Sequence, residues 1–171
     1  MSTRTTTRPA DPALHWQTEP SARSAHQGPT PARRGRGDDA PTYDGIDDQL
    51  GDARSRLTRV TARTAYQEVV HGRAVIVDIR PGWQRQADGV IHPDLAPVVI
   101  ERNHLEWRFD PRHEARLPIA SFELRVLVIC QEGYTSSLAA DALVRLGVGR
   151  ATDIAGGFAA WRAAGLPTAP A

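Results

Sequence analysis

From about residue 55 onward, short apolar runs alternate with longer amphipathic stretches. Two runs, at 74–80 (AVIVDIR) and 124–130 (LRVLVIC), are apolar at successive positions and rich in β-branched residues, which is typical of strands buried on both faces. Further short strands are expected at 56–62, 96–102 and 150–157. Because helix-like stretches separate these runs, the pattern predicts an α/β fold with about five parallel strands and helices on both faces of the sheet.

The stretches between the strands carry helix signals. AYQEVVHG (65–72) is expected to form a helix capped by Thr64 and closed by Gly72, and FAAWRAAG (158–165) a final helix. PGWQRQADG (81–89) suits a short helix or a loop. In SSLAADALVRLG (136–147) the apolar residues recur with the helical period and form one apolar face of a predicted helix, which Gly147 ends. The residues of that face are Leu138, Ala142, Leu143 and Leu146.

Residues 1–53 lack such periodicity and mix Pro, Gly, Ser, Thr and Arg with isolated apolar residues. This composition predicts a disordered N-terminal tail followed by one domain over 54–171. The start of the chain has no apolar signal-peptide region, and no run approaches the roughly 20 apolar residues of a membrane span. We therefore expect a cytoplasmic protein without a membrane partner.

The charge of the chain is nearly balanced. All 21 basic residues are arginine, the acidic residues number 20, and the formal net charge is +1. This balance gives no indication of nucleic-acid binding. The single cysteine, Cys130, excludes an internal disulfide and a cysteine-rich zinc site. Histidines 92, 104 and 113 lack metal-ligand spacing, so neither a metal nor another cofactor is expected.

Cys130 is the candidate for chemistry because it ends a predicted parallel strand, where ligands of open α/β sheets bind. A free cysteine at this place is often a small core residue, and position alone leaves both interpretations open. The following loop, QEGYTSS (131–137), favours a nucleophile. Gly133 permits a tight turn. Backbone N–H groups that point inward, together with the N-terminus of the next helix, would then bind an anion. A thiolate at this place would have a lowered pKa.

Three segments, AVIVDIRP, CQEGYTSSLAADAL and ATDIAGGFAAWRAAGLP, occur in the order and spacing of a single-domain rhodanese. The resemblance covers about residues 57–168 and implies the rhodanese-like fold and a sulfurtransferase activity. Cys130 would be the catalytic nucleophile that carries sulfur as a persulfide. The loop that binds the substrate anion would comprise Gln131, Glu132, Gly133, Tyr134, Thr135 and Ser136.

The same resemblance implies the partners: a small sulfur donor, thiosulfate or a low-molecular-weight persulfide, and a thiol or cyanide acceptor, with a protein acceptor also open. Asp78 and Arg80 match the family's D-x-R and are expected to be structural, with Arg80 a possible supporting residue at the site. Gly156 and Gly157 match a turn before the last helix, whose Trp161 is expected in the core.

Two departures from the family pattern bear on function. Glu132 stands in a loop where thiosulfate-using members often carry Arg or Lys, so thiosulfate is expected to be a poor donor. The altered segment 88–96 has extra residues around His92 to Ala96, and we expect them to reshape the entrance of the site. The alternative function is a catalytically weak rhodanese-like module that binds a partner or senses oxidants. A phosphatase of the C-x5-R type is disfavoured because the arginine position holds Ser136.

Overall fold

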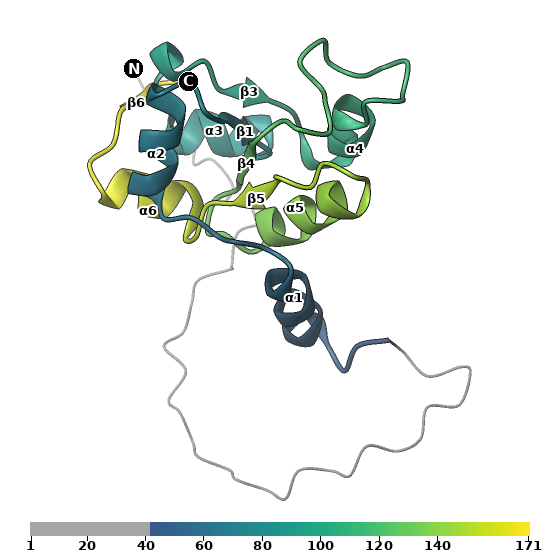
Figure 1. The fold of residues 1–171 in the computed structure, drawn as a ribbon. Coiled ribbons are helices and arrows are strands. Elements are labelled where there is room, and N and C mark those ends of the chain that lie inside the picture. The colour runs from purple at the N-terminus through teal and green to yellow at the C-terminus, as the bar shows by residue number, and fades with distance from the viewer. Residues whose placement is uncertain (1–41) are drawn as a thin grey trace, which may run out of the picture. The chain divides into compact units, whose positions relative to one another are not determined.

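The computed structural model describes residues 42–171, and within them a parallel sheet carries the fold. Its strand order is β3-β1-β4-β5, with β4 between β1 and β5 (Figure 1). The strands are β1 (Val75–Asp78), β3 (Val98–Val99), β4 (Val126–Ile129) and β5 (Thr152–Asp153). The predicted α/β fold class is confirmed. The strand expected at 56–62 is reduced to one parallel bridge between Val60 and Ile154, beside β5.

A second, two-stranded antiparallel sheet was not expected from the sequence. It pairs β2 (Val90–Ile91) with β6 (Thr168–Ala169), which joins the end of the chain to the segment after β1. The region between β2 and β4 contains short helical elements in place of long strands. These elements are η1 (Pro93–Leu95), η2 (Arg102–His104) and α4 (Leu105–Phe109).

Helices cover both faces of the parallel sheet (Figure 1). On one face, α2 (Ala62–Val70) and α6 (Gly157–Ala163) pack against Ile76, Leu127 and Ile129, and Trp161 is fully buried there as expected. On the other face lie α4 and α5 (Thr135–Arg145). Helix α3 (Gly82–Asp88) follows β1.

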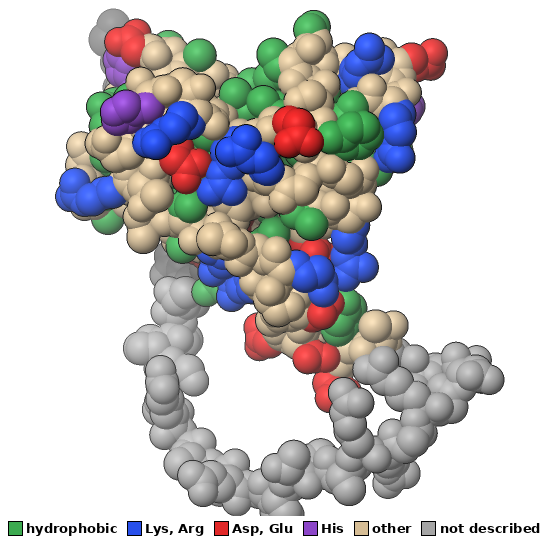
Figure 2. Space-filling model, in the orientation of Figure 1, with side chains coloured by type: hydrophobic (Ala, Val, Ile, Leu, Met, Phe, Trp, Pro, Cys, Tyr) green, Lys and Arg blue, Asp and Glu red, His purple; other side chains and the backbone are tan. Residues whose placement is uncertain are grey.

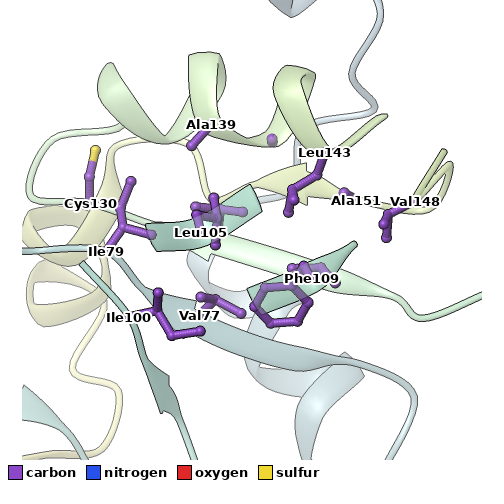
Figure 3. Packing of buried hydrophobic residues seen from close by; sticks show 13 residues of the cluster. Val77, Ile79, Ile100, Leu105, Phe109, Cys130, Ala139, Leu143, Val148 and Ala151 are labelled. Atoms are coloured by element: carbon purple, nitrogen blue, oxygen red, sulfur yellow. The ribbon is translucent and has the colours of Figure 1, made fainter. Parts of the chain in front are cut away.

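Strand alternation decides on which face the cysteine lies. Val126, Val128 and Cys130 belong to the same buried cluster as Phe109 and Leu143, on the α4 and α5 side of the sheet. Figure 3 shows Cys130 at the edge of this cluster beside Ile79, with its sulfur turned away from Phe109. The core therefore fixes the cysteine backbone and leaves its sulfur at the margin.

The domain boundary predicted at residue 53 falls within a helix, α1 (Ile46–Ser55). This helix buries Leu50 and Ala53 and packs against α5. Sequence reasoning missed it because its mean hydropathy is low and its apolar residues are few. The earlier part of the predicted tail, residues 1–41, lies outside the described residues.

Two details of the predicted helices also differ. The N-cap of α2 is Thr61, whose hydroxyl accepts the N–H of Thr64 at 3.2 Å, so Thr64 is not the cap. On α5 the most buried apolar residues are Ala139, Ala140 and Leu143. Of the predicted face, Leu138 and Ala142 are half-buried and line a hollow with Ala53 of α1, because α5 packs on a helix as well as on the sheet. In residues 42–171 no helix is long and apolar enough to cross a membrane.

Candidate active site

Three neighbouring strands bring polar residues to one edge of the sheet. Asp78 ends β1, Cys130 follows β4 and Asp153 ends β5, and β4 is the middle strand of the three. Since parallel strands end at the same edge, these side chains flank one position. Cys130 is 9% exposed, which leaves its sulfur at the boundary between the core and the surface.

The sulfur of Cys130 accepts two backbone hydrogen bonds. The N–H of Gly133 lies 3.2 Å from Sγ and that of Ser136 lies 3.3 Å away. Helix α5 has no side-chain cap, so Sγ takes that place by accepting the N–H of its second residue. Backbone dipoles at this helix end favour negative charge on the sulfur. Of the six residues predicted to form the anion-binding loop, Gly133 and Ser136 donate their backbone N–H groups to Sγ.

Close backbone packing gives the loop its shape. Gly133 has a φ of +80°, and a Cβ on it would lie 2.7 Å from the nitrogen of Gly156. A Cβ on Gly157 would lie 2.4 Å from the carbonyl oxygen of Cys130. The first turn of α6 then holds the start of the loop, because Phe158 donates its N–H to the Cys130 carbonyl at 2.8 Å. Only glycine fits at these approaches.

Hydroxyl groups connect the sulfur to a buried carboxylate. The Cys130 thiol donates to Ser136 Oγ at 3.2 Å, and the Ser136 hydroxyl donates to Asp153 Oδ2 at 3.1 Å. Ser137 Oγ lies 2.9 Å from the same oxygen. Asp153 is fully buried and pairs with Arg59 through bonds of 2.8 and 3.0 Å. The hydrogen bonds from Cys130 through Ser136 to Asp153 form a path along which the thiol proton can move to a carboxylate.

Sequence reasoning missed Arg54, Arg59, Ser137 and Asp153. The available signal was Asp153, a carboxylate within the last predicted strand, three residues before Gly156. The two arginines carried no signal because they precede Gly133 by 79 and 74 residues in sequence and meet the loop only in the folded chain.

Asp78 and Arg80 form a buried pair beside the loop. Arg80 is 1% exposed, donates to Asp78 at 2.7 Å and lies 3.7 Å above the Phe158 ring. It contacts the predicted loop through the side chain of Gln131, at 3.3 Å. No hydrogen bond joins Arg80 to the sulfur within the described chain, so its guanidinium serves Asp78, Gly89 and Gln131.

The remaining predicted loop residues lie at the surface. Glu132, Tyr134 and Thr135 are exposed, and Thr135 does not cap α5. The Tyr134 ring lies 5.5 Å from the guanidinium of Arg54. In residues 42–171 no cluster of three or more His, Cys, Asp or Glu side chains is arranged to hold a metal ion.

Comparison with known proteins relates this site to one family. The model of the rhodanese-like domain matches residues 61–164. The thiosulfate sulfurtransferase GlpE of Actinobacillus pleuropneumoniae is 31% identical over 111 residues, which cover 65% of this chain and 92% of that protein.

Solved structures show the same fold. A protein of unknown function from Rhodopseudomonas palustris, described as a possible tyrosine phosphatase, is 31% identical with a TM-score of 0.67 and covers 78% of this chain and 100% of its own. The polysulfide-sulfur transferase homodimer of Wolinella succinogenes is 21% identical with a TM-score of 0.58, over 71% of this chain and 84% of that one. At 21% identity the second likeness concerns the fold alone.

Proposed function

This chain belongs to the rhodanese-like domain family, and from that premise we propose that it is a sulfurtransferase in which Cys130 carries the sulfur. The observation that supports this most directly is the pair of N–H groups, from Gly133 and Ser136, that converge on the only thiol of the chain. Such donors stabilise a sulfur atom that becomes negatively charged in each half of a transfer.

In the first half-reaction the Cys130 thiolate attacks the outer sulfur of the donor. A bond forms between Sγ and that sulfur, the donor's S–S bond breaks, and the inner fragment leaves with the electron pair. The thiol proton departs along Ser136 Oγ toward Asp153, since these groups are already hydrogen-bonded in sequence. Donors that fit are thiosulfate, which the relative from Actinobacillus pleuropneumoniae is named for, and a low-molecular-weight persulfide.

In the second half-reaction a thiol or cyanide acceptor attacks the terminal sulfur of the persulfide. The bond to Sγ breaks and the Cys130 thiolate returns to its two N–H donors. Because the chain has one cysteine, no internal thiol resolves the persulfide, and the acceptor comes from outside. The cycle needs neither a redox cofactor nor a metal.

The site argues less well for phosphate-ester hydrolysis, the activity suggested for the relative from Rhodopseudomonas palustris. A phosphatase of the C-x5-R type uses an arginine of the loop to hold phosphate bidentately. Here Ser136 stands at that position and its hydroxyl is engaged with Cys130 and Asp153. Of the arginines that reach the loop, Arg54 and Arg59 donate to the carbonyl of Gly133 and Arg80 donates to the side chain of Gln131.

Intact-protein mass spectrometry tests the proposal. The wild type and a Cys130→Ser variant are incubated separately with thiosulfate and with a low-molecular-weight persulfide, then with cyanide. We expect the wild type to gain one sulfur atom and to lose it to cyanide as thiocyanate, and the variant to remain unchanged with its fold intact. No gain with either donor would reject sulfur transfer in favour of a binding or oxidant-sensing module. Turnover of an aryl phosphate would favour the phosphatase.

A further inference from the structure

Most of the charge around the loop is neutralised in pairs. Arg59 is bound to Asp153, and Arg80 is bound to Asp78, each through short bidentate contacts. The loop itself contains Glu132 and no basic residue. If these groups were the whole environment, the site would present a net negative charge to an anionic donor.

Arg54 changes this charge balance. Its Nη2 donates to the carbonyl of Gly133 at 2.9 Å, its Nε donates to Ser137 Oγ at 3.1 Å, and its guanidinium faces the ring of Tyr134. No salt bridge within residues 42–171 includes Arg54. It is therefore a half-buried cation bound to the loop without a carboxylate of its own.

Arg54 reaches the loop from a helix outside the region that matches the family. Helix α1 ends at Ser55, whereas the family match begins at residue 61. The helix is fastened to α5 by Arg56, which contacts Asp141 at 2.6 Å. The hydrogen bond from Arg56 holds the pKa of Asp141 below its ordinary value, so this pair stays charged. Figure 2 shows basic side chains gathered where α1 meets the rest of the described chain.

We propose that Arg54 is a positioning residue that supplies from α1 the positive charge that the loop lacks. It fixes Gly133 through its carbonyl while the N–H of the same residue donates to Sγ, and its charge favours an anionic sulfur and an anionic donor. The proposed effect of Arg54 on the sulfur depends only on the contacts around Cys130. The proposed effect of Arg54 on the donor rests on the proposed sulfur transfer.

Alkylation of Cys130 by a neutral and by an anionic reagent separates these effects. Rates with iodoacetamide and with iodoacetate are measured from pH 5 to 10 for the wild type and for Arg54→Ala, Arg54→Lys and Arg63→Ala. Arg63, exposed on α2, is the matched control because its loss removes one positive charge without touching the loop. Thermal unfolding of each variant checks the fold.

For Arg54→Ala we expect the iodoacetamide rate at neutral pH to fall about tenfold, because the sulfur loses a nearby positive charge that favours its anionic form. The pH profile moves upward, and the iodoacetate rate falls further because the anion loses its attraction. Arg54→Lys recovers part of both effects, and Arg63→Ala stays within about twofold of the wild type. Equal rates for Arg54→Ala and Arg63→Ala with both reagents would overturn the proposal.

The same variants distinguish this inference from the proposed function. Alkylation requires no sulfur transfer, so a wild type that gains no sulfur but shows the Arg54 effect would reject the proposed function and retain the role of Arg54 toward the thiol. In a wild type that does transfer sulfur, we expect Arg54→Ala to raise the KM for thiosulfate more than for an uncharged trisulfide donor. An equal change for both would overturn the role of Arg54 toward the donor.

Discussion

Two buried aspartates, each paired with an arginine, flank the cysteine, one on each neighbouring strand. Asp78 at the end of β1 binds Arg80, and Asp153 at the end of β5 binds Arg59. Both carboxylates are at most 2% exposed, and both receive two guanidinium nitrogens. By residue type, burial of the carboxylate and position relative to β4, the pairs are nearly equivalent.

Their remaining contacts differ. Asp78 accepts the backbone N–H of Arg80, two residues away, and that arginine is stacked on Phe158. Asp153 accepts hydroxyl groups from Ser136 and Ser137 of the loop, and its arginine also holds the carbonyl of Gly133. The first pair closes a turn after a strand, whereas the second joins the nucleophile's loop to the sheet. The role of a buried carboxylate therefore depends on which donors use its other lone pairs.

The largest expected effect comes from breaking the first pair. Asp78→Ala leaves the Arg80 guanidinium, whose side chain is 0% exposed, without a counter-charge. Removal of one partner of a buried pair costs about 3–5 kcal/mol. We expect the free energy of unfolding in urea to fall by that amount.

The control for this variant is Asp94→Ala, which removes a carboxylate with an 88% exposed side chain. Its effect on the free energy of unfolding is expected to stay within about 0.5 kcal/mol. If the two variants lose equal stability, the Asp78–Arg80 pair does not support the fold as its burial implies.

Compared with substitution of Asp78, Asp153→Asn is expected to affect stability less and the reactivity of Cys130 more. Arg59 is 24% exposed in its side chain and keeps access to water, so the loss of stability is expected to be smaller, about 2–3 kcal/mol. The amide, however, no longer offers a charged acceptor to Ser136. Arg59, which donates to the Gly133 carbonyl, then lacks its counter-charge, and positive charge beside the loop favours an anionic sulfur. We expect the rate of Cys130 alkylation per folded molecule to rise at least about threefold, and further than in Asp78→Asn, with stopped-flow alkylation as the measurement. A larger rise in Asp78→Asn would contradict the assignment of the two pairs.

The sequence was sufficient for the parts of this site that are local. The strand before Cys130 is apolar on both faces, which predicted the place of the cysteine at the end of a buried strand. Gly133 predicted the tight turn of the loop that follows. Asp78 and Arg80 of the D-x-R were expected to be structural, and in the structure the two residues form a buried pair.

Contacts between distant segments were not predictable in this way. Arg59 meets Asp153 across 94 residues, and Arg54 meets Ser137 across 83. An arginine in a stretch without apolar periodicity gives no indication of its partner, and α1 carries too few apolar residues to be recognised as a helix of the domain. Short elements such as β2 and β6 were missed since a two-residue strand has no measurable period.

A third aspartate–arginine pair, between α5 and the end of α1, extends the comparison and carries the smallest expected effect. Asp141 of α5 holds α1 through Arg56, and that hydrogen bond lowers its pKa from 3.8. A carboxylate whose pKa is lower in the folded state than in the unfolded state stabilises the fold fully at pH values above its unfolded-state pKa. This contribution is lost as the pH falls below about 4. Asp141→Asn should therefore lower Tm by roughly 3–5 °C at pH 6, equivalent to about 1 kcal/mol for a partly exposed network. The difference between variant and wild type should shrink toward zero near pH 3 in calorimetry. A difference that is constant from pH 6 to pH 3 would mean that shape, and not charge, fastens α1.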